Sequence, residues 1–277
     1  MTAQKIRDQF RQLVEGPDED IPLDEAALLI AAEATPDLNL QHYLTYLDRA
    51  AQQFEKLQAR ARPIGVPVTA LLDFIHQQEG FSGNINHYYD PENSYLPHVI
   101  DTRNGIPITL ALIHICIGRR LGLPVAGISF PGHFLVSYGY EQRVIVDPFG
   151  GRILSEADCG NLLRQIAGPR AIMQPEYFEA ASNRSILLRI LDNLKQIFWH
   201  NKDWEQSRSC IERQLLLIPE QTEYNIQLGA VFEMQGNPQA AELTYIRVLE
   251  NAADDRIREL ASKRLMALSA GSRPVIH

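Results

Sequence analysis

His133 and Asp147 are the two side chains whose types and spacing could do chemistry together. His133 follows Pro131-Gly132 at the start of an apolar run, and Asp147 ends the next apolar run, 14 residues later. If the two runs form a tight hairpin, a carboxylate would hold one imidazole nitrogen while the other faces a nucleophile. That is the base and its orienting acid in acyl-transfer sites. A purely structural hydrogen bond that joins two strands is the alternative for the same two residues.

Three short runs of β-branched and aromatic residues must position this pair. Each run is bounded by turn residues, and together they predict adjacent antiparallel strands at residues 124–130, 133–138 and 143–147. Pro148-Phe149-Gly150-Gly151 ends the third run, and a helix is expected to follow at 155–166.

A buried helix is predicted over residues 107–121, just before the strands. Pro107 suits a first helical turn and Gly122 suits a C-terminal cap. Because apolar residues occupy nearly every face, this helix should lie at the centre of a domain. Its N-terminus would point near the histidine, which is where a helix dipole would lower the pKa of a thiol.

The nucleophile is the missing part of this arrangement. The first turn of the helix reads Pro107, Ile108 and Thr109, and the first two cannot attack a carbonyl. Cys116 lies about 13 Å further along the helix axis, at 1.5 Å per residue, and is expected to be buried and inert. Thr109 would need a base and an oxyanion hole in an unusual geometry.

Residues 80–104 have the composition of a loop, with Gly, Asn, Asp and Pro interleaved with aromatic residues. The stretch is richer in Tyr and Asn than a simple connection requires. We therefore expect a ligand to contact this region and the adjoining helix start, through Tyr88, Tyr89, Asn93, Asn104 and Thr109.

Helices are expected at both ends of the chain. The first 80 residues predict helices at 23–33, 40–61 and 68–78. From residue 183 onward two helical segments align at a separation of 34 residues, which is typical of tetratricopeptide helix pairs. A generic helical hairpin array is the alternative. Residues 255–268 would form a capping helix.

The composition is that of a soluble globular protein and narrows the classes of partner. The 277 residues are 45% hydrophobic and carry a net charge of -8, which disfavours nucleic acid and anionic membranes. No apolar run reaches the length of a spanning helix, and the N-terminus lacks a signal peptide, so we expect a cytoplasmic protein. Three widely spaced cysteines predict neither a disulfide framework nor a zinc site. No cofactor or metal is expected.

The central region resembles the SirB family of bacterial proteins, in which a transglutaminase-like domain precedes tetratricopeptide repeats. The runs NGIPITL, RRLGLP and PGHFLV, followed by VDPF, carry this resemblance, which covers about residues 20–155. It implies a transglutaminase/papain-like fold with His133 and Asp147 as base and orienter. It also places Pro107 where the wider superfamily has its cysteine; the SirB family is similar in lacking that cysteine.

The expected fold class is therefore α+β. A central buried helix packed on a small antiparallel sheet would form a transglutaminase-like domain over residues 1–180, and a helical repeat domain would cover 183–277. Three functions stay open. The first is a non-catalytic module that binds a peptide or small ligand in the cleft and a protein on its repeats. The second is a hydrolase or acyltransferase with an unconventional nucleophile. The third is a structural adaptor in which the His–Asp pair only braces strands.

Overall fold

The computed structural model describes residues 2–35, 37–61, 68–140 and 143–271. By its internal contacts the chain divides into two compact units, Met1–Ile190 and Leu191–His277. The chain is mostly helical with a small sheet, so the α+β class is confirmed. No helix within the described ranges combines the length and apolar character that crossing a bilayer requires.

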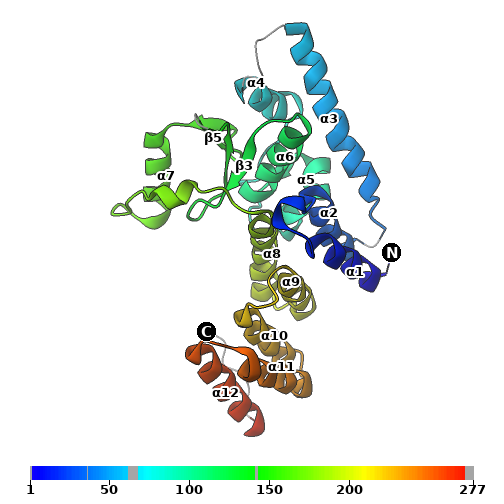
Figure 1. Ribbon diagram of the computed structural model, residues 1–277, viewed down its shortest axis with the longest axis vertical. Coiled ribbons are helices and arrows are strands. Elements are labelled where there is room, and N and C mark those ends of the chain that lie inside the picture. The colour runs from blue at the N-terminus through cyan, green and yellow to red at the C-terminus, as the bar shows by residue number, and fades with distance from the viewer. Residues whose placement is uncertain (1, 36, 62–67, 141–142, 272–277) are drawn as a thin grey trace. The chain divides into compact units, whose positions relative to one another are not determined.

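The first unit begins with helices and ends with a sheet and further helices (Figure 1). Its α-helices are α1 (Ala3–Val14), α2 (Leu23–Ala34), α3 (Leu40–Ala61), α4 (Val68–Asp73), α5 (Leu96–Thr102), α6 (Pro107–Arg120), α7 (Glu156–Ala167) and the start of α8 (Asn183–His200). Short helical turns are η1 (Asp18–Asp20), η2 (Phe74–Gln78, of π type), η3 (Pro91–Ser94) and η4 (Pro175–Phe178).

Four antiparallel strands form the main sheet in the order β3 (Val125–Ile128), β4 (Leu135–Tyr138), β5 (Val144–Asp147) and β6 (Arg152–Leu154). Val136 pairs with Val146, so the start of β4 lies beside the end of β5. A separate two-residue pair joins β1 (Ser82–Gly83) to β2 (Asn104–Gly105) in parallel. The three predicted strands are therefore present, and β6 is an addition to them.

Helix α6 is the centre of the first unit. Its residues from Pro107 to Gly118 are all buried, and it packs on β3 and β4 as well as on α2 and α3. A helix that is apolar on every side has no solvent face, so it must be covered all round. The predicted helix at 107–121 is thus confirmed, with Leu121 as its C-cap.

Two local expectations were incomplete. Residues 80–104 are not all loop, because they contain η3 and α5, and α5 ends at Arg103 in a left-handed conformation (φ 62°) where glycine is usual. His133 lies in the turn before β4 rather than in the strand. Gly132 takes a left-handed φ of 65°, and the His133 N–H donates to the Phe130 carbonyl, so the strand begins only at Leu135.

The second unit consists of helices that pack on their neighbours in chain order. They are the rest of α8, then α9 (Trp204–Leu217), α10 (Thr222–Met234), α11 (Pro238–Asn251) and α12 (Asp255–Ser269). Gly229 on α10 allows the close approach of α11, because a Cβ there would lie 2.4 Å from the ring of Tyr245. Tyr245 is fully buried and donates its hydroxyl hydrogen to Glu233 at 2.6 Å.

Candidate functional site

The structure brings His133 and Asp147 into direct contact. His133 Nε2 lies 2.9 Å from Asp147 Oδ1, and both side chains are largely buried. An ionised carboxylate can only accept hydrogen bonds, so Nε2 carries the proton and donates it. Nδ1 is therefore the nitrogen that is left for another partner.

Asp147 is held as an anion by its surroundings. Burial by itself raises its pKa. The hydrogen bond and charge of His133, together with the backbone N–H groups of Gly150 and Phe149, lower the pKa by more than burial raises it. The net pKa lies below the usual aspartate value. The Phe149 N–H donates to Oδ1 at 3.0 Å. A Cβ at Gly150 would lie only 2.7 Å from Oδ2, so this turn needs glycine to enclose the carboxylate.

A series of aromatic rings leads from His133 to the surface. Phe149 stands edge-on to His133 with ring centroids 6.3 Å apart, Tyr88 contacts Phe149 at 5.9 Å, and Tyr89 contacts Tyr88 at 5.3 Å. We call Phe149, Tyr88 and Tyr89 the aromatic strip. Gly83 permits the position of Phe149, because a Cβ there would lie 2.6 Å from its ring.

Asn93 and Thr109 fix the loop that carries the two tyrosines. Both side chains are fully buried. Asn93 Nδ2 donates to the carbonyls of His87 and Tyr88, at 2.6 and 3.3 Å, and its Oδ1 accepts from Asn84 Nδ2 at 2.9 Å. Thr109 Oγ1 donates to the Asn93 carbonyl at 2.8 Å. These bonds occupy the groups that we expected to meet a ligand, so the two residues position the loop.

Asn104 also takes part in local bonds. Its Oδ1 accepts from Ser82 Oγ at 3.2 Å, and its Nδ2 donates to the Thr102 carbonyl at 2.8 Å. Of the five residues expected to contact ligand, Tyr88 and Tyr89 are the ones whose side chains reach the surface as a pair.

The cysteines are not arranged as nucleophiles. Cys116 is buried on α6, and burial followed by the nearby charge of Asp24 raises the pKa of its thiol. Cys159 on α7 is buried too, and its pKa is raised by burial and then by Asp158. Pro107 is the buried first residue of α6. Among the described contacts of His133, none is to a thiol.

Two further histidines, His76 and His114, form a buried cluster in the same unit, which the sequence did not predict. His76 on η2 and His114 on α6 approach with their Nε2 atoms 3.0 Å apart. His76 Nδ1 lies 2.8 Å from the Phe81 carbonyl, and His114 Nδ1 lies 2.8 Å from the Tyr138 hydroxyl. His114 is therefore a buried core residue with a partner on both ring nitrogens.

The Phe81 carbonyl determines where each proton of this cluster sits. A carbonyl can only accept, so His76 Nδ1 donates to it and His76 Nε2 accepts from His114. His114 Nδ1 must then accept from Tyr138. Burial, followed by the charge of His76, lowers the pKa of His114 to about 3, and burial also lowers the pKa of His76. Both imidazoles are therefore neutral at physiological pH.

Sequence reasoning missed this cluster because no local signal links its members, which are 38 and 24 residues apart. It also missed Arg152, whose Nε lies 4.0 Å from Asp147 Oδ2. Within the described ranges, no group of three or more His, Cys, Asp or Glu side chains could hold a metal ion.

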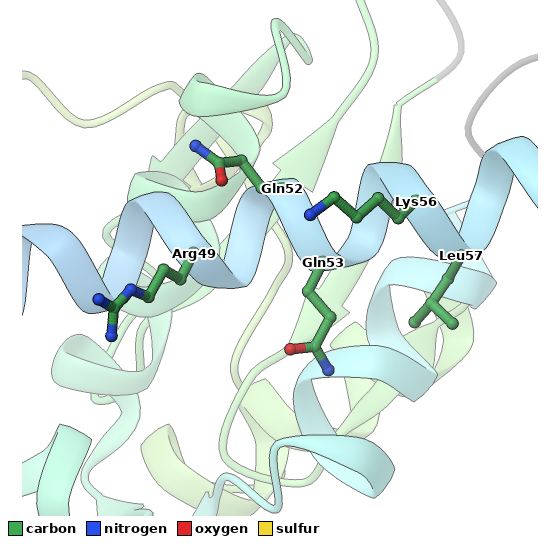
Figure 2. A pocket seen from close by; sticks show the side chains of 5 residues that line it. All are labelled: Arg49, Gln52, Gln53, Lys56 and Leu57. Atoms are coloured by element: carbon green, nitrogen blue, oxygen red, sulfur yellow. The ribbon is translucent and has the colours of Figure 1, made fainter.

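Two of the hollows at the surface of the described residues are lined by side chains other than these. One, of about 400 Å³, runs along α3; Figure 2 shows its lining side chains, Arg49, Gln52, Gln53, Lys56 and Leu57, all carried by that one helix. The other, of about 660 Å³, belongs to the second unit and is lined by Asp192, Lys195, Gln196, Trp199, His200 and Gln227. These residues come from α8 and α10.

Comparisons with known proteins agree with this architecture. The family model described as the transglutaminase-like superfamily matches residues 41–192. A UPF0162 protein of Xylella fastidiosa is 35% identical, covering 90% of this chain and 91% of the relative. A UPF0162 protein of Vibrio cholerae is 28% identical over 94% of this chain and 98% of its own length.

A more distant similarity extends to eukaryotes. F-box only protein 21 of Homo sapiens is 25% identical over 64% of this chain, which corresponds to 29% of that protein. No solved structure matches the chain. The extent of the family match and the near full-length bacterial relatives show that this chain belongs to the transglutaminase-like superfamily, in a bacterial family of UPF0162 proteins.

Proposed function

We propose that this protein is a non-catalytic, transglutaminase-like binding module of the SirB type, located in the cytoplasm. A peptide would lie beside His133 and Asp147 against the aromatic strip. The helices of the second unit would act as tetratricopeptide repeats that hold a protein partner and give the module a regulatory role. The observation that carries this proposal is a preserved His–Asp pair whose described contacts include no thiol.

The electrostatics of the cysteines support the absence of catalysis. A thiolate, not a thiol, is the attacking species, and enzymes generate it by placing the sulfur where positive charge or a helix N-terminus lowers its pKa. Cys116 and Cys159 show the opposite, since burial and neighbouring acids raise the pKa of both. At neutral pH each would remain a protonated, buried side chain.

The packing of the second unit supports the repeat assignment. Gly229 and Ala241 allow α10 and α11 to approach, and the buried ring of Tyr245 fills the space between them. This is the small-residue and aromatic pattern that the 34-residue alignment predicts. The hollow of about 660 Å³ between α8 and α10 offers Trp199 and the amides of Gln196 and Gln227 to a partner.

The alternative is a hydrolase or acyltransferase with an unconventional nucleophile. One observation favours it: His133 bonds Asp147 through Nε2, which leaves Nδ1 available as a base. A hydroxyl group brought by a neighbouring segment or by the substrate would then take the place of the missing thiol.

Covalent labelling separates these two functions. The full chain would be incubated with iodoacetamide and with a fluorophosphonate, and labelled peptides would be mapped by mass spectrometry in wild type and His133→Ala. We expect no labelling that depends on His133. A label that is present in wild type and lost in His133→Ala, while circular dichroism shows the variant still folded at the labelling temperature, overturns the non-catalytic proposal and identifies the nucleophile.

A further inference from the structure

Arg152 lies beside the His–Asp pair but makes only one long contact with it. Its Nε lies 4.0 Å from Asp147 Oδ2, at the limit of an ion pair, whereas His133 contacts the same carboxylate at 2.9 Å. Its side chain is 61% exposed. A guanidinium has five N–H donors in a fixed planar fork, and among the described residues no side-chain hydrogen bond occupies those of Arg152.

A second arginine, Arg189, adds positive charge near Tyr88 of the aromatic strip. Arg189 lies within electrostatic range of the Tyr88 hydroxyl, where its charge opposes the rise in pKa that burial causes. No ion pair within the described residues involves Arg189. The nearest acids in the loop have partners: Asp90 Oδ1 accepts from the Glu92 N–H at 3.0 Å, and Glu92 lies 3.5 Å from His98. Arg152 and Arg189 thus bring two cations to a surface that also carries the carboxylates of Asp90 and Glu92, and the charge of Arg152 also acts on Asp158.

Tyr88 and Tyr89 of the aromatic strip, and Ile85 of the same loop, are exposed on a loop whose backbone is held in place. Tyr89 is 81% exposed, Ile85 is 78% exposed and Tyr88 is 38% exposed. Their loop does not need to be ordered by a ligand, because the buried amide of Asn93 already fixes its backbone at His87 and Tyr88. A surface that is fixed before binding loses less conformational entropy when the ligand arrives.

We propose that this surface binds an extended peptide through an acidic side chain, which Arg152 holds, while apolar side chains of the same peptide cover Tyr88 and Tyr89. The inference rests on the proposed binding function and names the chemistry of its ligand. A guanidinium fork matches the two oxygens of a carboxylate, and a charge-assisted pair of this kind is about twice as strong as a neutral hydrogen bond. Asp147 does not repel the ligand strongly, since its charge is met by His133 and by two backbone N–H groups.

Two peptides that differ in one charge test the inference. The probes are N-acetyl-Leu-Glu-Phe-amide and N-acetyl-Leu-Gln-Phe-amide, which have the same shape and no terminal charge. Each is titrated at millimolar concentration into the isotope-labelled full chain while the ring resonances of His133 and the amide of Phe149 are followed by NMR. We expect the glutamate peptide to bind about tenfold more tightly than the glutamine peptide.

The variant Arg152→Gln should bring both peptides to the same, weaker affinity. Arg49→Gln is the matched control, because Arg49 is also an exposed arginine. It lines the hollow along α3 together with Lys56 (Figure 2), and this hollow could attract the same carboxylate. This control should leave the preference for glutamate unchanged. A preference that disappears in Arg49→Gln instead overturns the inference and places the acidic side chain on α3.

The remaining outcomes separate the inference from the proposed function. If both peptides bind equally near His133 and Arg152→Gln changes nothing, binding at the cleft stands and the acidic ligand is wrong. If neither peptide shifts the His133 or Phe149 resonances, both the inference and cleft binding of peptides are overturned. A leucine-free control peptide, N-acetyl-Gly-Glu-Gly-amide, should bind more weakly, since it cannot cover the tyrosines.

Discussion

His133 and His114 lie in the same unit, one in the turn before β4 and the other on α6, yet their partners differ in charge. His133 is bonded to the carboxylate of Asp147 beside an exposed strip, whereas His114 is fully buried between the neutral groups of His76 and Tyr138. An imidazole that faces an anion can gain a proton and keep its partner. An imidazole whose two nitrogens are both committed to neutral partners must break a hydrogen bond to do so.

This difference separates a histidine available for binding or chemistry from one that specifies the core. In His114 both nitrogens are satisfied inside the protein, and no atom is left for a ligand. In His133 one nitrogen is satisfied and the other is not committed to any described partner. Burial alone would not have separated the two, because the His133 side chain is itself only 12% exposed.

Removing each imidazole in turn gives the largest expected effects and tests whether His114, and not His133, is the core histidine. His114→Ala should lower the free energy of unfolding by about 3–5 kcal/mol, because it leaves a cavity and two buried polar partners without a hydrogen bond. His133→Ala should cost about 1–3 kcal/mol. Urea unfolding of both variants and the wild type gives the two values; a larger loss for His133→Ala would reverse our assignment of the core histidine.

Acid should weaken the buried cluster before it protonates Asp147. In the unfolded chain the two histidines bind protons at the usual histidine pKa of 6.5, but the folded chain resists protonation because the pKa of His114 and that of His76 are lowered. Their stabilisation is complete above pH 6.5 and is lost as the pH falls below it. We expect the free energy of unfolding to decrease by about 2 kcal/mol between about pH 6.5 and pH 5.

Asp147 should act in a lower pH window. Its folded pKa lies below the usual aspartate value of 3.8, so its stabilisation is present above that value and is lost only as the pH falls through the lower folded pKa. Unfolding measured along a pH series in wild type, His76→Gln and the exposed-residue control His42→Gln checks both windows. Above pH 5, the dependence of the free energy of unfolding on pH should become weaker in His76→Gln alone. An equal dependence in all three proteins would mean that other groups cause the loss of stability.

Asp147→Asn should have a moderate effect. The substitution keeps the shape of the side chain and removes the charge that holds His133, so we expect a loss of about 1–2 kcal/mol in the free energy of unfolding. Asp73→Asn, which changes an exposed carboxylate at the end of α4, is the control. If Asp147→Asn lowers stability but leaves peptide affinity intact, the pair is only a brace between strands, as the structural-adaptor hypothesis holds.

Arg152→Gln should have the smallest effect on stability, within about 0.5 kcal/mol of wild type, because an exposed ion pair at this distance contributes little. Thermal unfolding by circular dichroism measures it. A small change is also what makes this variant a clean test of ligand binding. A loss comparable to that of Asp147→Asn would mean that Arg152 supports the turn rather than a ligand.

The sequence predicted the parts of the fold that have local causes. Helix α6 was foreseen because Pro107 and Gly122 mark its ends and its apolar residues cover every face. The hairpin that joins His133 to Asp147 was foreseen because β-branched runs alternate with turn residues. Strand β6 was missed, since three residues with two exposed side chains give no periodic signal. Helix α5 was missed because it ends at Arg103 instead of glycine.

Long-range contacts were beyond sequence reasoning. Nothing in the residues near His76 indicates that it meets His114, because α6 and the helical turn at Phe74–Gln78 come together only through packing of the whole unit. The same holds for Asn93, which looked like a ligand-binding amide in a polar loop. Its burial, and the two loop carbonyls that it bonds, depend on α6 closing over it through Thr109.

The single carbonyl of Phe81 gives the two buried histidines opposite spectroscopic signatures. His76 should show the nitrogen-15 pattern of an imidazole protonated at Nδ1, and His114 that of one protonated at Nε2, in the same spectrum. The shared Nε2 proton is shielded from water, so it should exchange slowly enough to be seen downfield of the amide region. Its resonance would report, without any added label, whether α6 is still seated in the unit when a ligand or a partner binds elsewhere.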